Sequence, residues 1–366
     1  MNCRLCNSTK LKKVIDFRNI VNFSVMSDNR IFNEPLVIYL CNYCSLLQKK
    51  SSEKQQLDYF SDFNSHQLTD GEEQLKFDKG KMIPRSKLIL NNISYFIPTQ
   101  PGKILDIGTG NGAFLKEFIE KFPKWELFGQ DLQDNSINEL VKVISKNNFI
   151  NKDISKIETK FHDISLIHVL NHIVDLKSFL QNIRKLMFTD SILIIQLPYI
   201  RESLSDLIII ESINHFSKQS IYKLLSSFFT NITIKDNIQG ELTIVASNTS
   251  KSTLFIPESQ TTIENIVERF NHLIKYLATQ SEELAIFGTS PLGTFLGHII
   301  KAKLFCFIDE DYTKYEKKLL TKKIIHPTNL KKNVKVVLPF LNESLVDSLK
   351  NKYKNIFFID VFNDFN

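Results

Sequence analysis

The chain has 366 residues, of which 43% are apolar, so it can form two or three domains with real hydrophobic cores. Its 46 basic and 40 acidic residues give a net charge of +6, which falls well short of a dedicated nucleic-acid binder. No apolar run reaches the length of a membrane span, and the first residues lack the apolar core of a signal peptide. We therefore expect a cytoplasmic protein without a membrane partner. The abundance of Lys, Ile, Asn and Phe is typical of an AT-rich bacterial gene.

Four of the five cysteines lie near the start of the chain as two C-x-x-C pairs: Cys3, Cys6, Cys41 and Cys44. Two such pairs supply the four thiolates of a tetrahedral zinc site. Because reduced thiols are expected here, structural zinc is favoured over a redox pair or chance spacing. Four thiolates leave no open coordination position, which argues against catalytic zinc. The fifth cysteine, Cys306, lies in the apolar run LFCFID and is predicted to be a buried strand residue.

An aromatic and polar segment follows, from residue 57 to 67. Tyr59, Phe63 and His66 are candidates to reach a substrate from this connection, although the sequence favours a linker that packs its aromatic rings against the next domain. Residues 72–97 look helical, with an interruption at Pro84.

The strongest motif is Lys103 to Gly112, KILDIGTGNG, in which an apolar strand ends in Asp106 and a glycine-rich turn precedes an apparent helix. Glycines allow backbone N–H groups to come close to a ligand. About twenty residues later, Asp131 ends a second apparent strand, where an acidic residue can accept both ribose hydroxyls. The spacing therefore predicts a nucleoside-cofactor site. Its candidate residues also include Gly108, Thr109, Gly110 and Leu132.

The glycines also fit a loose G-x-G-x-x-A, so a dinucleotide is an alternative, as is a turn that binds nothing. Asp106 argues against the dinucleotide, because a pyrophosphate would place negative charge beside this carboxylate. The run D-x-G-x-G-x-G instead resembles the first motif of class I S-adenosylmethionine (SAM) methyltransferases.

From Lys103 onward strands and helices alternate, which predicts a doubly wound α/β sheet. The expected strands are 103–107, 126–130, one near Phe149, 164–168, 192–197, 232–235 and 242–246. The expected helices are 112–122, 135–146, 176–187 and 218–229. A parallel core that ends in an antiparallel hairpin is usual for class I methyltransferases.

Several polar residues fall where ligands bind such a sheet. Asp153 follows the third strand, where it could accept from an adenine amino group or be a solvated loop residue. His168 and His172 follow the fourth strand in HVLNH, which resembles the V-L-E-H run of many small-molecule methyltransferases. His172 is predicted to line the active site, with a helix-start role as the alternative. We place His168 among the cofactor-binding candidates and Tyr199, after the fifth strand, among the substrate-binding ones.

A Ser/Thr-rich stretch, residues 247–260, is predicted to be a linker. After a helix near 261–279, a second α/β unit begins with a strand at 283–287, a glycine turn and a helix at 292–300. Strands at 304–308, 334–338 and 356–359 and a helix at 342–352 complete it. This unit could hold the nucleotide of a substrate or be a structural partner. The expected domains are 1–70, 71–250 and 251–366.

The order of these three parts resembles the bacterial sugar C-methyltransferases, which act on nucleotide-linked keto-deoxysugars. The run from Cys41 to Gln48, CNYCSLLQ, is similar to that family's C-x-x-C-G-L-V-Q, and FGTSPLG (287–293), FIDEDYTKYEKKLL (307–320) and LPFLNE (338–343) resemble its later landmarks. The resemblance implies a small N-terminal zinc-binding domain, a class I SAM domain and a C-terminal Rossmann-like domain. It also implies a mechanism in which a base removes a proton beside a ketone and the enolate takes the methyl group of SAM.

The chain departs from this family where members carry Tyr-His-Glu-His and then Ser-Tyr-Phe-Ser. Glu211 is retained, whereas Ile210 and Ser212 replace both histidines and His215 replaces the later tyrosine. His172 matches the family's histidine after the fourth strand. We therefore name His172, Glu211 and His215 as catalytic candidates, any one of which could be the base.

The principal hypothesis is a SAM-dependent methyltransferase for a nucleotide-linked sugar in surface-polysaccharide or sugar-metabolite synthesis, acting as a monomer or weak homo-oligomer. Methylation of a hydroxyl group is an alternative, since it needs only one base and positioning. A zinc-ribbon RNA methyltransferase is another, disfavoured by the weak charge and missing basic stripe. The third is a SAM-binding module that has lost catalysis.

Overall fold

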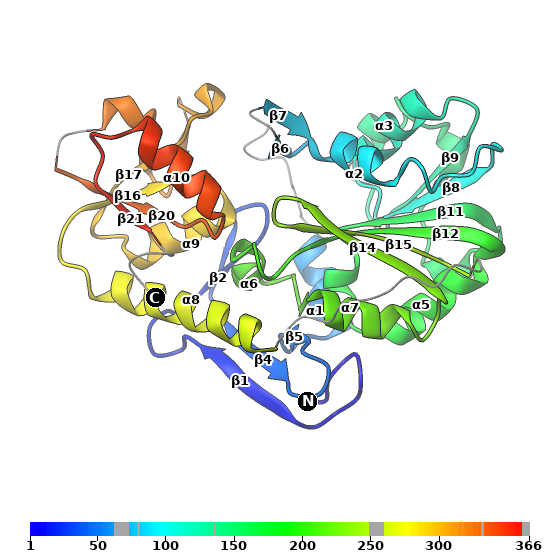
Figure 1. The fold of residues 1–366 in the computed structure, drawn as a ribbon, viewed down its shortest axis with the longest axis horizontal. Coiled ribbons are helices and arrows are strands. Elements are labelled where there is room, and N and C mark those ends of the chain that lie inside the picture. The colour runs from blue at the N-terminus through cyan, green and yellow to red at the C-terminus, as the bar shows by residue number, and fades with distance from the viewer. Residues whose placement is uncertain are drawn as a thin grey trace.

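The computed structural model describes residues 1–61, 73–78, 81–134, 136–248, 260–315, 317–330 and 333–360. These residues form sheets of four, seven and six strands and two additional two-stranded sheets. The seven- and six-stranded sheets occupy opposite sides of the view in Figure 1, and the blue N-terminal segment lies between and below them. The predicted α/β class, with a mixed and mainly parallel central sheet, is confirmed.

The N-terminal sheet is antiparallel and takes its last strand from much later in the chain. Its order is β1 (Leu11–Asp16), β4 (Val37–Cys41), β5 (Leu47–Gln48) and β13 (Asn214–His215). A hairpin of β2 (Ser24–Val25) and β3 (Ile31–Phe32) lies beside it, and helix α1 (Glu53–Phe60) follows. Ser52 begins α1 with a capping box that it shares with Gln55. Residue His215 is thus part of a sheet that the cysteine-bearing segment builds.

The central sheet has the doubly wound order that the sequence predicts. Its strands are, in spatial order, β10 (Phe149–Ile150), β9 (Glu126–Gln130), β8 (Lys103–Ile107), β11 (Phe161–Ile167), β12 (Met187–Pro198), β15 (Glu241–Ser247) and β14 (Asn231–Ile238). The first five run parallel, and β12, β15 and β14 pair antiparallel. The chain moves from β8 outward to β10 and then returns to β11, so the switch point at which ligands bind lies between the carboxyl ends of β8 and β11.

Helices cover both faces of this sheet because neighbouring strand residues point in opposite directions. Ile104 packs on the face covered by α2 (Arg85–Ile93) and α3 (Ala113–Lys121). Leu105 packs on the face covered by α5 (Leu176–Lys185) and α7 (Lys218–Leu225). The remaining short helices of this part are α4 (Ile137–Leu140), α6 (Ser205–Ile208), η1 (Lys146–Asn148), η2 (Ile154–Lys156) and η3 (Leu170–His172).

Two predicted helices are wrong over most of their length. Within residues 72–97, the described part forms a hairpin of β6 (Leu75–Asp78) and β7 (Lys81–Pro84), and only α2 is helical. A proline disfavours the helical conformation of the residue before it, so the helix begins after Pro84. Of the predicted helix 135–146, residues 136–145 form only α4 and a series of turns, because the β-branched residues and asparagines here favour a helix weakly.

The C-terminal sheet is parallel except at one edge. Its order is β18 (Lys318–Leu319), β19 (Lys322–Ile325), β17 (Leu304–Ile308), β16 (Leu284–Phe287), β20 (Lys335–Leu338) and β21 (Phe358–Asp360). The helical segments are α8 (Gln260–Thr279), α9 (Pro291–Ile299), α10 (Glu343–Lys352), η4 (Tyr312–Lys314) and η5 (Pro327–Asn329). The sequence missed β18 and β19. Cys306 is 3% exposed in β17, as predicted.

The N-terminal segment packs against the C-terminal unit as well as the central sheet. Phe17 contacts Phe270 of α8 at a ring distance of 5.7 Å, and Phe23 contacts Phe295 of α9 at 5.2 Å. These rings belong to one continuous hydrophobic cluster that also includes Leu207 of α6. Among the described residues, no helix combines the length and the apolar character that crossing a bilayer requires.

Candidate active site

The glycine turn after β8 folds back over the end of β9. Gly108, Gly110 and Gly112 all have positive φ values, of 67°, 52° and 79°. The N–H groups of Gly108 and Thr109 donate to the carbonyl oxygen of Gln130 at 2.8 and 3.0 Å. A Cβ atom on Gly110 would meet no atom within 4 Å, so the turn faces open space there. This geometry fits a nucleoside cofactor approaching the backbone closely.

Two carboxyl groups flank that turn. Asp106 is 2% exposed and accepts from Ser165 Oγ at 2.6 Å. Burial raises the pKa of Asp106 to about 7, against the hydrogen bond from Ser165, and a bound ammonium group would offset this cost. Asp131 accepts from Gly110 N at 3.1 Å and from Gln133 N at 3.0 Å, so it ties the turn to the end of β9. Asp106 thus suits the ammonium group of a bound SAM molecule, and Asp131 suits its ribose hydroxyl groups.

The other cofactor candidates lie around the same strand ends. Leu132 is 50% exposed beside Asp131, which leaves an apolar surface at this edge. The Thr109 side chain is buried, and a Cβ atom on Gly129 would lie 2.9 Å from its methyl group, so it packs inward. Asp153 is exposed and accepts from Ser155 N at 2.9 Å, where it caps η2.

His168 lies at the end of β11 with a φ of 58°. Its Nε2 is 2.9 Å from Oε2 of Glu241, whose other oxygen lies 2.7 Å from Lys76 Nζ. Glu241 is 2% exposed, and the charges of His168 and Lys76 hold the pKa of its carboxyl group below the usual range despite burial. His168 is therefore engaged in a buried ion cluster beside the sheet edge. The sequence missed Glu241 because its position opposite Pro198 depends on strand pairing.

The three catalytic candidates gather in one buried cluster. His172, in η3, has its Nδ1 2.8 Å from the backbone oxygen of Glu211 and its Nε2 3.1 Å from Asn171 Nδ2. Glu211 and His215 are both 0% exposed. Oε1 of Glu211 accepts from the N–H and the hydroxyl group of Ser27. Within the part of the chain that the structure describes, neither Oε2 of Glu211 nor Nε2 of His215 has a hydrogen-bond partner.

Burial dominates the ionisation of this cluster. It raises the pKa of Glu211 to about 6, while the hydrogen bonds from Ser27 and the charge of Lys49 lower it. It lowers the pKa values of His172 and His215, so both imidazoles favour the neutral form. Both ring nitrogens of His172 have partners, whereas Glu211 and His215 each keep one atom that can accept a proton.

Sequence reasoning missed the partners of these three residues. Lys49, which follows β5, is 5% exposed and its Nζ donates to the carbonyl oxygens of Ile209 and Ser212. Asp206 of α6 is 3% exposed and faces His215 Nδ1. Two sequence features could have indicated them: Lys49 follows an apolar run, and Asp206 lies among leucines and isoleucines. Charged residues in such surroundings are rarely buried without partners.

The substrate candidates have different surroundings. Tyr59 is 6% exposed, donates to Glu34 Oε2 at 3.1 Å and packs with Met26 and Ile210. It therefore packs against the residue that precedes Glu211. The side chain of Tyr199 is fully buried in the hydrophobic cluster under β12. Phe63 and His66 lie outside the described residues.

The four N-terminal cysteines converge. Their sulfur atoms all lie within 4.8 Å of one another, with 3.4 Å between Cys3 and Cys44 and 3.6 Å between Cys6 and Cys41. Four sulfurs at 2.3 Å around one tetrahedral zinc would be about 3.8 Å apart. The residue after each pair, Asn7 and Ser45, has a positive φ, so both loops turn in the same way. The donor set and its spacing fit zinc.

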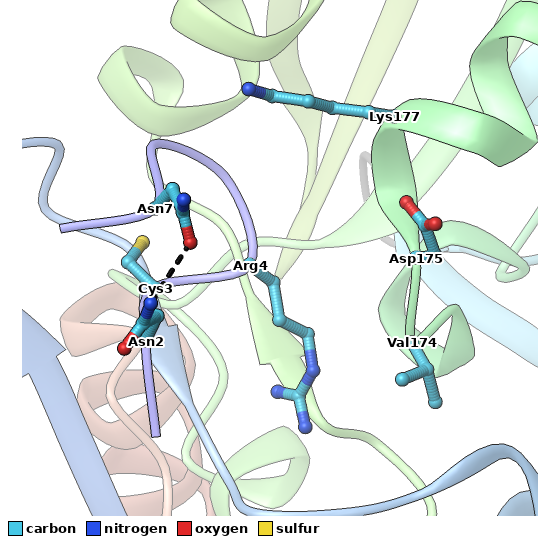
Figure 2. Close-up of a pocket in the computed structure, with 7 residues that line it drawn as sticks. All are labelled: Asn2, Cys3, Arg4, Asn7, Val174, Asp175 and Lys177. Carbon is cyan, nitrogen blue, oxygen red and sulfur yellow. Dashed lines mark hydrogen bonds between the residues drawn. The ribbon is translucent and has the colours of Figure 1, made fainter. Parts of the chain in front are cut away.

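A pocket of about 350 Å³ lies beside this cysteine cluster rather than at the glycine turn. In Figure 2 its labelled residues come from two segments, the loop of Cys3 and Arg4 and the start of α5 with Asp175 and Lys177. The guanidinium of Arg4 donates to the carbonyl oxygen of Ile213 at 3.3 Å. The cysteine loop thus contacts the segment that carries His215.

Comparison with known proteins identifies the class. Residues 84–230 match the family model described as a methyltransferase domain. That span contains the glycine turn, Asp131 and the three catalytic candidates. The protein is therefore a SAM-dependent methyltransferase, as the sequence predicts. No curated protein sequence matches the chain.

Solved structures show only distant similarity. The plantazolicin methyltransferase BpumL in complex with SAH is 14% identical over 44% of this chain and 82% of that one, with a TM-score of 0.36. Coclaurine N-methyltransferase, bound to N-methylheliamine and SAH, is 13% identical over 45% of this chain and 54% of that one, with a TM-score of 0.35. The pyocyanin biosynthetic protein PhzM is 16% identical over 44% and 54%, with a TM-score of 0.37. The match thus spans about half the length of coclaurine N-methyltransferase and of PhzM. Similarity at this level does not indicate which molecule accepts the methyl group in this protein.

Proposed function

We propose that this methyltransferase acts on a nucleotide-linked keto-deoxysugar, in surface-polysaccharide or sugar-metabolite synthesis, and methylates the carbon beside the ketone. The observation that supports the proposal is the buried cluster of His172, Glu211 and His215, in which Glu211 and His215 each keep an atom that has no hydrogen-bond partner among the described residues. A Cβ atom on Gly108 would lie 2.8 Å from Val169, and η3 with His172 follows directly. The sugar class rests on the sequence resemblance, which extends over nearly the whole chain.

The chemistry requires removal of a proton from carbon. Bound SAM supplies the methyl group, whose bond to sulfur breaks, with its electrons remaining on sulfur, as the acceptor's electron pair forms the new bond. The chain's own residues take the proton: among the described residues, His215 and Glu211 each hold an atom without a hydrogen-bond partner that can accept it. Their burial excludes water, which would otherwise compete for the proton and for the charge that develops on the ketone oxygen.

We further propose that Cys3, Cys6, Cys41 and Cys44 hold one structural zinc ion. The four sulfur atoms are close enough to share one ion, and four thiolates leave no position for a substrate. The divisions at residues 1–70, 71–250 and 251–366 then separate the zinc-binding, methyltransferase and Rossmann-like domains. In this arrangement the zinc domain positions the catalytic loop instead of taking part in chemistry.

The test is incubation of the protein and SAM with a panel of nucleotide-linked keto-deoxysugars, with detection of SAH and of a methylated product. If no substrate of this panel led to the release of SAH, the proposed substrate class would be contradicted. Deuterium exchange at the carbon beside the ketone, run without SAM, separates carbon from oxygen transfer. Exchange that is lost in the His215→Gln variant supports an enolate, and no exchange in an active parent protein favours O-methylation. Salt-dependent filter binding of RNA would instead support the RNA methyltransferase alternative.

A further inference from the structure

Asp206 is placed to orient the imidazole of His215. Its Oδ2 atom faces Nδ1 of His215, and its Oδ1 atom accepts from the hydroxyl group of Ser212. An ionised carboxylate only accepts hydrogen bonds, so Nδ1 must carry the hydrogen and the lone pair must reside on Nε2. The hydroxyl oxygen of Ser212 also accepts a hydrogen bond from Nδ2 of Asn171 at 3.2 Å. This second bond fixes the orientation of the Ser212 hydroxyl group that donates to Asp206.

The Nε2 atom of His215 is buried, and no described residue provides a hydrogen bond to it. Leaving a buried acceptor unpaired costs free energy. A buried acceptor without a partner is expected in a catalytic site, where the same atom accepts a proton from the substrate. The geometry of Asp206 and His215 therefore presents one lone pair in one fixed orientation.

Lys49 reaches the same cluster from the N-terminal sheet. Its Nζ donates to the carbonyl oxygens of Ile209 and, at 2.8 Å, Ser212, and its N–H donates to the carbonyl oxygen of Ile213 at 2.9 Å. Strand β5, directly before Lys49, pairs with β13, and Leu47 of β5 lies opposite His215 of β13. One residue therefore holds both the loop that carries Glu211 and the strand that carries His215.

We propose that Asp206 and Lys49 are the positioning residues of His215 in methyl transfer: Asp206 fixes its tautomer, and Lys49 holds the loop and balances the carboxylate. This inference rests on the proposed function only in naming the reaction that His215 assists.

The charges around His215 act in opposing directions. The groups that face the cluster are Arg4 from the first cysteine loop, Lys49 after β5, His172 of η3, Asp206 of α6 and Glu211. Burial lowers the pKa of His215, Asp206 raises it, and Lys49 and Arg4 lower it again. Burial also lowers the pKa of Lys49 to about 7, against the attraction of Asp206 and Glu211. Protonated Lys49 thus opposes the effect of Asp206 on the pKa of His215. Asp206 can therefore orient the imidazole while the imidazole stays neutral.

The cluster is connected to the cofactor turn through the loop that follows β11. Gly108 abuts Val169, the residue before η3, and the carbonyl oxygen of Asn171 accepts from Ile213 N at 2.8 Å. Asn214 donates to the carbonyl oxygens of Leu170 and Ile173, at 3.2 and 2.7 Å. The segment of His215 is therefore fastened to the loop that touches the glycine turn.

The test is nitrogen-15 NMR of the full-length protein labelled in its eight histidines, with His215→Gln to assign the signals. The parent protein should show a neutral His215 protonated at Nδ1 through neutral pH. Lys49→Met should raise the pKa of His215 by about one unit, and Asp206→Asn should remove the single tautomer. The matched exposed variants Lys50→Met and Asp134→Asn should leave the His215 signals unchanged.

Methyl transfer is then measured with the sugar substrate. Asp206→Asn should lower kcat about 100-fold or more with little change in KM or in SAM affinity, because orientation and not binding is lost. In Lys49→Met the acidic limb of the pH–rate profile should move upward, which loss of stability alone would not cause. A parent His215 that is Nε2-protonated, or that keeps its tautomer and pKa in both variants, overturns the proposal. Because the NMR signals need no substrate, failure to methylate any nucleotide sugar counts against the proposed function separately.

Discussion

Ser27 donates its backbone N–H to Oε1 of Glu211 at 2.9 Å, and its hydroxyl group donates to the same atom. Ser27 lies in the turn between β2 and β3, and the N–H of Ile210 donates to the carbonyl oxygen of Val25 at 2.8 Å. In the same turn, Asn29 accepts from Thr294 of α9 at 2.7 Å. One N-terminal hairpin thus connects the C-terminal unit to a catalytic candidate.

The burial of Glu211 should make stability depend on pH. Its pKa is raised from 4.5 to about 6, mainly by burial, so the folded state binds this proton more tightly than the unfolded state. The free energy of unfolding therefore falls as pH rises through this interval. Glu211→Gln lacks that titration. Between about pH 4 and pH 7.5, its stability relative to the parent should rise by about 2 kcal/mol, as urea unfolding would measure.

The exposed residue Glu158 provides the control, because Glu158→Gln should show no such pH-dependent gain. Parallel pH profiles for Glu211→Gln and the parent would mean that Glu211 ionises at an ordinary pKa in the folded protein.

Local patterns predicted the features that depend on neighbouring residues in the chain. The glycine turn after β8 and the alternation of strands and helices are of this kind, because backbone geometry follows short-range sequence there. The hairpin of β6 and β7 was missed because residues 72–97 have a mixed pattern whose outcome Pro84 decides.

The polar partners of the candidate site could not be predicted in the same way. Lys49 and Ser212 are far apart in sequence, and β13 has only two residues, too few for a periodic signal. Asp206 and His215 are nine residues apart, and only the turn between α6 and β13 brings them together. Sequence analysis therefore identified the candidate base but not the residues that position it.

The loss of Asp131 should weaken SAM binding. A hydrogen bond to a charged group contributes roughly 1.5–3 kcal/mol, so Asp131→Ala should reduce affinity by about 10- to 150-fold in calorimetry. The variant also frees Gly110 N and Gln133 N, which should loosen the turn. Asp134→Ala, at an exposed position three residues later, is the matched control. Equal affinities for the parent and Asp131→Ala would remove Asp131 from the cofactor site.

Two alanine substitutions in the glycine turn should differ in their effects. Gly108→Ala would place its Cβ 2.8 Å from Val169, whereas Gly110→Ala would project into open space. Both pay roughly 1–2 kcal/mol for a left-handed conformation, but only Gly108→Ala adds a steric clash. Thermal unfolding should therefore show the larger loss for Gly108→Ala. Gly110→Ala should remain folded and bind SAM weakly, and unaltered SAM affinity would show that the cofactor does not approach this residue.

The cysteine cluster should bind one zinc ion and support the candidate site. Metal analysis of the parent protein should give about one equivalent, because the four sulfurs are spaced for a tetrahedral ion. Cys41→Ser should lose most of the zinc and much of the stability, since such a site contributes roughly 10–16 kcal/mol of apparent binding energy. Cys306→Ala, in β17, should keep its zinc and serves as the control for loss of a buried thiol. Because β5 joins the cysteine loops to His215 through β13, chelation should also lower methyl transfer more than SAM affinity. A Cys41→Ser variant that retains zinc and stability would show that these thiols are not a metal site.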